Sequence, residues 1–427
     1  MIAALILLFL VVLLVLRIPI GFALIVAGSV GLTVTSGWEA AYGVLKTAPL
    51  TTTGIYELIT VPMFLLMAEF VVASGIADDL FRSAAIWIGR VRGGLAIATA
   101  LAGAGFAAIS GSSTASAATL SSTSLPAMIK HQYQDSLAAG VVSISGTLAM
   151  LIPPSIAVIV YGLIAEESIG KLLIACVIPG LVVTAAIIFT VLLIGWMEPG
   201  SLPRGQSFTF KEKLRSSKVA LPMILLFLAV TGIIYFGVAT PTEASSLGAF
   251  GALLLALASR KLNREVFVRA VRRAARISCM IMTIVLGAQF FGYFFAMTRT
   301  TVIFSEFVMG LGLPDWGILI AVLCLLLILG CFLDGIAILV LTVPTLLPLM
   351  KGLGYDPIWF GVMVILTVEI GMVTPPLGMN VFVVSRVTGI PLQTVFKGVW
   401  PHVLAHVILL ALFTIFPGLI LWLPETM

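Results

Sequence analysis

Long apolar segments recur along almost the whole chain, and they constrain its fold more than any other feature of the sequence. Apolar residues form 61% of the 427 positions, whereas charged residues form only 10%. A water-soluble fold could not cover that much apolar surface with so few charges, but a lipid bilayer accepts helices of about 20 apolar residues. The pattern therefore predicts an all-α polytopic membrane protein and excludes a cytosolic enzyme.

Two apolar stretches differ from the simple spans. Residues 94–129 and 315–350 are each too long for one crossing, and polar or small residues interrupt them in the middle. We interpret both as re-entrant helical hairpins. No basic residue precedes the run at 2–16 and no small-residue cleavage site follows it, so we expect a retained first span rather than a signal peptide. Full spans are expected near residues 2–16, 19–36, 58–75, 137–165, 171–196, 219–237, 241–259, 277–297, 357–385 and 400–423.

Proline positions reveal an internal repeat with a constant offset of 222 residues. The matching prolines are Pro19 with Pro241, Pro126 with Pro348, and the pair Pro153-Pro154 with the pair Pro375-Pro376. Each half holds three spans, a hairpin, a span broken at a proline pair and a closing span. Five crossings per half is an odd number, so the second half must enter the membrane upside down relative to the first, as an inverted repeat.

This repeat divides the chain into three parts. We expect a first repeat at residues 1–200, a polar cytoplasmic linker at 201–218 and a second repeat at 219–427. The broken spans are then residues 137–165 in the first repeat and 357–385 in the second. The linker leaves no room for a soluble nucleotide-binding domain.

The lysine and arginine residues agree with this topology. If the N-terminus lies outside, only Lys46, Lys171, Arg299 and Lys351 fall on the outer side, which leaves 19 of the 23 basic residues inside. Basic residues accumulate on the cytoplasmic side of membrane proteins, so this distribution favours membrane orientation over nucleic-acid binding. Residues 263–276 combine five arginines with apolar residues, and we expect an interfacial helix there, before the span at 277–297.

Both hairpins carry oxygen atoms that suit a small cation. The cluster Ser110–Ser113 includes Gly111, and a helix is expected to break there and free its backbone carbonyls. Hydroxyls and carbonyls are hard oxygen ligands, although small residues of this kind also allow close helix packing. By the offset of 222, Ser112 corresponds to Asp334 of the second hairpin. A carboxylate inside a membrane is costly unless it is used or paired, so Asp334 is either functional or part of a buried structural pair.

The two proline pairs supply the other half of each candidate site. Proline has no N–H group and prevents the preceding residue from staying helical, so carbonyls near Ala149–Ile152 and Gly371–Thr374 lose their helical partners. The half-helix that resumes after each pair directs its positive N-terminus into the same region. Broken helices at matching positions of inverted halves are typical of the substrate site of a secondary transporter. Kinked helices without a ligand are the alternative.

Other polar residues allow weaker inferences. Glu69 and Glu369 either carry a proton, pair with arginine or make a structural hydrogen bond, and His402 and His406 are expected to pack at an interface. The sequence contains no HExxH, GxSxG or Walker A motif, so we expect neither an enzyme nor a transporter driven by ATP. A membrane structural protein or channel, with the hairpins lining a pore, is the alternative from another class.

Five segments together resemble a known family: the SGSS hairpin, IPPSIAVIVYG (Ile152–Gly162), the FLDG hairpin, GYDPIWFGV (Gly354–Val362) and IGMVTPPLGMNVFV (Ile370–Val383). They are similar to the large membrane subunit, DctM type, of tripartite ATP-independent periplasmic (TRAP) transporters, and the resemblance covers essentially the whole chain. It implies a sodium-driven elevator of the ion transporter superfamily in the bacterial inner membrane, with a periplasmic N-terminus.

The resemblance also implies partners. Such subunits operate with a small four-helix membrane subunit and a periplasmic substrate-binding protein. Because this chain begins directly with its first span, the small subunit is expected to be a separate polypeptide. The alternative within transport is a stand-alone sodium- or proton-coupled carboxylate carrier of the same superfamily.

The resemblance implies that two or more sodium ions are carried together with a small carboxylate, from C4-dicarboxylates to sugar acids. The first sodium site would use Ser110 and Ser112 with carbonyls around Ala149, Ile152 and Pro154. The second would use Gly330, Gly371, Thr374 and the carbonyl near Leu377. The substrate is expected between these sites, at Ser113, Ser155, Asp334, Gly335, Pro376 and Asn380.

Overall fold

A computed structural model describes residues 2–198, 200, 202–203, 205 and 207–427 of the chain. All regular secondary structure among these residues is helical, which confirms the predicted all-α class. The first half contains α1 (Ile2–Val15), α2 (Ile20–Ser36), α3 (Trp38–Thr53), η1 (Tyr56–Ile59), α4 (Thr60–Ser74), α5 (Ile76–Ile88), α6 (Gly94–Ser110), α7 (Ser113–Thr123), α8 (Leu125–Lys130), α9 (Asp135–Thr147), η2 (Leu148–Met150), α10 (Ile156–Ala165), α11 (Ile169–Ala175) and α12 (Val177–Met197).

The second half begins with a long helix that includes the end of the predicted linker. Its elements are α13 (Phe210–Tyr235), α14 (Pro241–Ala258), α15 (Arg264–Met297), α16 (Thr300–Met309), α17 (Asp315–Gly330), α18 (Gly335–Gly352), α19 (Pro357–Gly371), α20 (Met379–Thr388), α21 (Leu392–Ile415) and α22 (Gly418–Glu425).

The offset of 222 residues found in the sequence also relates the helix boundaries. Subtracting 222 from the bounds of α18 gives 113–130, and α7 and α8 together extend from Ser113 to Lys130. The same subtraction places the start of α19 at position 135, where α9 begins. Each hairpin and each broken span therefore recurs with nearly identical boundaries.

Six described helical segments are individually long and apolar enough to cross a bilayer, and the segments 210–218 and 220–235 of α13 form a seventh that is bent by 51°. Ten spans were expected. Four expected spans consist of shorter helices: α1 and α2 are short, and the spans at 137–165 and 357–385 are each divided into two helices. One of the seven segments, α18, was expected as an arm of the second hairpin.

Two expectations about helix boundaries were wrong. The interfacial helix expected at 263–276 does not end before the next span, since α15 continues from Arg264 to Met297 as one helix of 34 residues. No proline interrupts this stretch, so nothing in the backbone stops the helix. At the C-terminal end, the span expected at 400–423 is divided at Pro417, where α22 starts.

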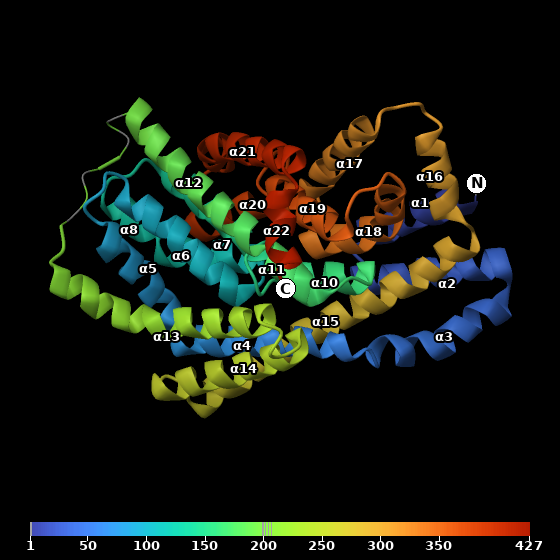
Figure 1. Cartoon of the computed structure of the whole chain (residues 1–427), viewed down its shortest axis with the longest axis horizontal. Coiled ribbons are helices and arrows are strands. Elements are labelled where there is room, and N and C mark those ends of the chain that lie inside the picture. Colours follow the sequence, from blue (N-terminus) through green and yellow to red (C-terminus); the bar gives the residue numbers. More distant parts are fainter. Residues whose placement is uncertain (1, 199, 201, 204, 206) are drawn as a thin grey trace.

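The helices form two bodies (Figure 1). One body, which we call the scaffold, consists of α1–α4 and α13–α15, and α15 packs against both α2 and α4. Glycine permits this close crossing, because a Cβ atom on Gly21 would lie 2.7 Å from the carbonyl oxygen of Thr283. The other body, which we call the hairpin body, contains the two hairpins, the two broken spans and the helices α11, α12, α21 and α22.

Candidate functional site

The first broken span is interrupted where its prolines predict. Because Pro153 and Pro154 have no N–H group, the carbonyls of Ala149 and Met150 lack the donor four residues ahead that a helix would supply. Ser155 compensates in part, since its hydroxyl donates to the Met150 carbonyl and accepts the N–H of Val158 at 3.4 Å. The segment is fully enclosed, and the Ser155 side chain has no exposed surface.

The tip of the first hairpin lies against this break. Helix α6 ends at Ser110, Gly111 adopts φ +55° and Ser112 is extended, so the chain reverses within two residues. A Cβ atom on Gly111 would lie 2.8 Å from the Ile156 side chain, at the start of α10. The hydroxyl of Ser110 lies 2.5 Å from that of Ser116 and 3.3 Å from the carbonyl oxygen of Ser112. The structure thus brings the first set of expected sodium ligands to one region.

The second break has the same relation to the second hairpin. A Cβ atom on Gly371 would lie 2.6 Å from the Cα of Gly330, so the ends of α19 and α17 meet backbone to backbone. The N–H of Gly378 donates to the carbonyl of Cys331 at 3.3 Å, which ties the far side of the break to the same hairpin. The hydroxyl of Thr374 donates a hydrogen bond to the carbonyl of Ile370, near the end of α19, at 2.6 Å.

Asn380 links the two halves of the site. Its side-chain amide nitrogen donates to the Ser113 hydroxyl at 2.7 Å and to the Ser143 carbonyl at 3.3 Å, and its backbone N–H donates to the Met372 carbonyl at 3.1 Å. Asn380 is fully buried, and its Oδ1 atom has no hydrogen-bond partner among the described residues. A buried acceptor without a partner is uncommon in native proteins, which makes this atom a candidate ligand contact.

The second hairpin makes the mirror contact with the first break. Gly335, the repeat mate of Ser113, packs directly against the thioether of Met150, and α18 packs against α10 as α7 packs against α20. Asp334 precedes Gly335 and caps α18, with its carboxylate accepting the N–H of Ile336 at 3.3 Å. Four of the six expected substrate residues, Ser113, Gly335, Asp334 and Asn380, therefore lie where hairpins and broken spans meet.

The remaining expected substrate residues differ in accessibility. Ser155 is enclosed and engaged in hydrogen bonds within its own span, whereas Pro376 and the neighbouring Leu377 are exposed. Two residues of this region were not expected from the sequence. The Ser116 hydroxyl lies within hydrogen-bond distance of the Ser110 hydroxyl, and the Met150 side chain contacts the second hairpin. The offset of 222, which relates Met150 to Met372, was the sequence feature that could have pointed to Met150.

The two intramembrane glutamates have different environments. Glu69 on α4 pairs with Arg273 on α15 at 3.5 Å, so it belongs to the scaffold. Glu369 on α19 is fully buried, and neither of its oxygens has a hydrogen-bond partner among the described residues. His402 and His406 are also fully buried on α21, as expected for packing residues.

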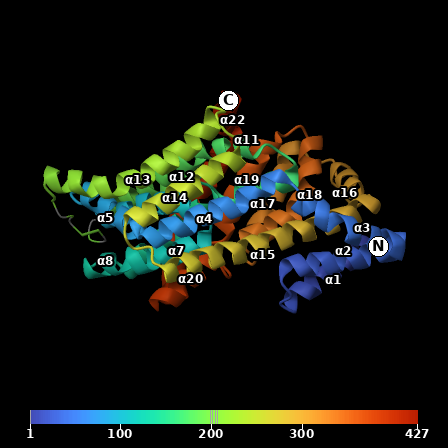
Figure 2. The same ribbon diagram turned by 90° about the horizontal axis from the view of Figure 1, so that it is seen from below.

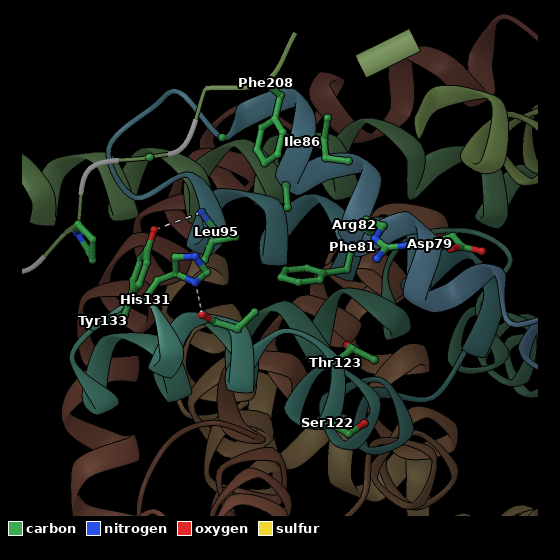
Figure 3. A pocket seen from close by; sticks show the side chains of 15 residues that line it. Asp79, Phe81, Arg82, Ile86, Leu95, Ser122, Thr123, His131, Tyr133 and Phe208 are labelled. Carbon is green, nitrogen blue, oxygen red and sulfur yellow. Dashed lines mark hydrogen bonds between the residues drawn. The ribbon is translucent and has the colours of Figure 1, made fainter. Parts of the chain in front are cut away.

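A separate cavity of about 680 Å³ lies at the far end of the first hairpin, between α5, α7 and α8 (Figure 3). The Leu95 N–H donates to the Tyr133 hydroxyl at 3.2 Å, and His131 Nδ1 lies 2.8 Å from the Ala127 carbonyl oxygen. Burial raises the pKa of Tyr133 above its ordinary value. Ser122 and Thr123 line this cavity, about ten residues beyond the tip at Ser113, so it is distinct from the candidate site.

Comparisons with known proteins agree with this architecture. The family model of the tripartite ATP-independent periplasmic transporter, DctM component, matches residues 7–419. The chain is 35% identical to the C4-dicarboxylate TRAP transporter large permease protein DctM of Pseudomonas aeruginosa, over 87% of this chain and 86% of that protein. It is 32% identical to the sialic acid TRAP transporter large permease protein SiaM of Vibrio cholerae, over 95% of each chain.

A further relative and one solved structure extend the comparison. The 2,3-diketo-L-gulonate TRAP transporter large permease protein YiaN of Escherichia coli is 30% identical, over 95% of this chain and 94% of that one. The crystal structure of the Alcanivorax borkumensis YdaH transporter superimposes with a TM-score of 0.65 at 14% identity, and the match covers 89% of this chain and 90% of the other. This last likeness supports the fold alone.

Proposed function

Because the chain belongs to the DctM family of large permease subunits of TRAP transporters, we propose that it carries a small carboxylate across the bacterial inner membrane together with sodium ions. The observation that supports this most directly is the pairing of each broken span with a hairpin tip, at Gly111 with Ile156 and at Gly330 with Gly371.

Sodium coupling is proposed from the chemistry of these two regions. In both regions the proline pairs remove the helical donors of backbone carbonyls, and the first region adds the hydroxyls of Ser110 and Ser112. Oxygen ligands of this kind suit a hard cation, and a nearby helix N-terminus suits an anion. We propose that sodium fills both regions and orders the hairpin tips, and that the carboxylate then binds near Ser113, Gly335 and Asn380.

The class of substrate is proposed from three of the relatives, whose names specify C4-dicarboxylates, sialic acid and 2,3-diketo-L-gulonate. All three are carboxylates. The helices α10 and α20 begin beside the hairpin tips, and their N-termini would offset the negative charge of such a substrate.

The transport step is proposed to be an elevator motion, in which the hairpin body moves past the scaffold. The strongest helix packing lies within each body, α5 packs against both α6 and α13, and both breaks lie in the hairpin body. We further propose a small four-helix membrane subunit and a periplasmic binding protein as partners, a periplasmic N-terminus, and no enzymatic activity.

The proposal is tested by reconstituting the full chain with the small membrane subunit and the binding protein encoded beside it. Uptake of labelled succinate, sialic acid and 2,3-diketo-L-gulonate into proteoliposomes is measured with sodium or choline outside. We expect saturable uptake of one carboxylate that disappears in choline. Equal uptake in both salts would exclude sodium coupling.

A second candidate function, a stand-alone carboxylate carrier of the same superfamily, is separated in the same experiment. Such a carrier would transport free substrate without the binding protein. The proposal therefore requires that omission of the binding protein abolishes uptake.

A further inference from the structure

A large apolar groove lies between α12 and α21 of the hairpin body. Its cavity measures about 970 Å³, and the start of α9 closes one end. Large apolar side chains on its walls are exposed, including Phe189 at 65%, Leu404 at 62% and Ile408 at 61%. The groove is separate from both breaks and takes no part in the function proposed above.

The polar and apolar parts of the groove are segregated. Gln134, Ser136, Glu198 and Lys397 all line the end where α12 finishes and α21 begins. Beyond that end Thr190 is the only Ser, Thr, Asn, Gln or charged residue among the described lining residues, and its hydroxyl donates to the Ala186 carbonyl at 2.8 Å. The lining is therefore apolar along most of its length, and its polar end carries one cationic side chain, Lys397, and one anionic side chain, Glu198.

The length of the groove matches one leaflet of a bilayer. Its lining extends over residues 186–198 on α12 and 397–409 on α21, which is 12 helical steps on each wall. At 1.5 Å per residue both walls are about 18 Å long. Half of a hydrocarbon core is about 15 Å thick, so the walls are about as long as one leaflet is thick.

The internal repeat indicates what kind of group such a groove receives. The repeat mates of α9, α12 and α21 are α19, α21 and α12, and the face that they form is covered by α22. Figure 2 shows α22 beside α11 at this face. Ile420 of α22 is fully buried there, in a segment of sequence GLILWLPE. An apolar segment of the chain itself thus fills the mate of the groove.

The first half has no such cover among its described residues. Helix α12 ends at Met197, and no helix occurs in the described part of 198–209. The chain turns instead toward α6, where Leu202 is buried against Gly93, and Pro203 lines the other cavity. The described residues of the first half therefore place no helix over the groove between α12 and α21.

We propose that this groove binds one phospholipid, with an acyl chain along α12 and α21 and its phosphate at Lys397. The apolar length suits the acyl chain, and the cation at the polar end suits the phosphate. Trp400 is 53% exposed beside Lys397, at the level where aromatic side chains meet lipid headgroups. With the orientation proposed above, the lipid belongs to the cytoplasmic leaflet.

Native mass spectrometry of the purified full chain tests this site with three probes: phosphatidylglycerol, diacylglycerol and inorganic phosphate. We expect one phosphatidylglycerol to bind preferentially, while diacylglycerol, which lacks the phosphate, and inorganic phosphate, which lacks the acyl chain, do not. Lys397→Gln is expected to weaken phosphatidylglycerol binding about fivefold. Lys211→Gln, which removes an exposed lysine outside the groove, is expected to leave it unchanged. Equal binding in both variants would overturn the proposal.

A second variant and a cross-linking experiment test the same groove without changing Lys397. Ala405→Phe places a ring in the groove and is expected to abolish phosphatidylglycerol binding without changing the melting temperature in detergent. If this variant does not fold, Thr190→Phe replaces it. A photo-reactive amino acid at Leu404 is expected to give a lipid adduct in membranes. An adduct with another protein, or with a second copy of this chain, would contradict the proposal.

Discussion

The two breaks of the repeat have the same backbone design but differ in accessibility. Residues 151–155 around the first proline pair are all buried. In the second break Pro375, Pro376 and Leu377 are all exposed, Leu377 at 42%. The two breaks related by the offset of 222 residues are thus enclosed in one half and exposed in the other.

Side chains at repeat-related positions explain this difference. Ser155 is the mate of Leu377, because 155 + 222 = 377. In the first break the Ser155 hydroxyl donates to the carbonyl of Met150, which is a hydrogen bond within the same loop. Leu377 cannot donate, and the carbonyl of Met372, the mate of Met150, accepts the backbone N–H of Asn380 instead. The second break is therefore closed by a backbone hydrogen bond, and the side chain of Leu377 stays exposed.

Proline pairs interrupt both helices, whereas the side chains around each interruption determine how exposed it is. We therefore expect changes at backbone-to-backbone contacts to have the largest effects on transport. Changes to linking side chains should follow, and changes to local caps and surface ion pairs should matter least.

Gly330→Val is expected to have the largest effect. The added side chain would collide with Gly371, and overpacking of this kind costs about 1–3 kcal/mol. Because the collision displaces the second hairpin from its break, we expect uptake to fall by about two orders of magnitude. The matched control is Gly352→Ala on the other arm of the hairpin, where a Cβ atom meets no heavy atom within 4 Å. Similar losses in both variants would mean that the backbone contact is unimportant.

Asn380→Ala is expected to reduce uptake about tenfold, because it removes the link between the second broken span and the first hairpin. Loss of a buried hydrogen bond costs about 1–3 kcal/mol. Thr388→Val on the same helix removes a bond to the Val384 carbonyl and one from the Ile390 N–H, both local to the end of α20, and serves as the control. An Asn380→Ala protein with native uptake would show that the two halves of the site act separately.

Ser155→Ala tests the closed break and Leu377→Ser the open one. The first change removes a helix cap and the bond to the Met150 carbonyl, so we expect a loss of about 1 kcal/mol in the free energy of unfolding. The second change is at an exposed position, and its expected effect lies within about 0.5 kcal/mol. Thermal unfolding of both proteins in detergent gives the comparison. If Leu377→Ser were the more destabilising, our explanation of the asymmetry would be wrong.

Lys351→Gln is expected to have the smallest effect. The ion pair of Lys351 with Glu167, at 2.9 Å, joins the second hairpin to the end of the first broken span, but it is partly exposed. Pairs of this kind contribute about 0.2–1 kcal/mol and are screened by salt. The melting temperatures of the two proteins should differ slightly at low salt and converge in 1 M choline chloride. A difference that persists at high salt would indicate more than an ion pair.

Much of the fold could be predicted from the sequence because its determinants are local. The proline pairs remove hydrogen-bond donors wherever they occur, and Gly111 with its serine neighbours permits a sharp reversal. The offset of 222 then transferred each feature to the other half. The continuity of α15 could also have been predicted from local sequence, because no proline separates Arg264 from Met297.

The contacts between the halves could not be predicted in this way. The bond from Asn380 to Ser113 joins residues 267 positions apart, and the contact of Met150 with Gly335 depends on how two helices pack. Proline spacing contains no information about either distance. The accessibility of the two breaks was likewise unpredictable, because it follows from tertiary packing around Ser155 and Leu377.

Hydrogen–deuterium exchange of the purified chain, in sodium chloride and in choline chloride, tests the central claim most directly. If the two breaks bind sodium, amides in 108–116 and 370–380 should exchange more slowly in sodium, while the scaffold helices α2 and α14 should exchange equally in both salts. Identical exchange of both breaks in the two salts would contradict the account.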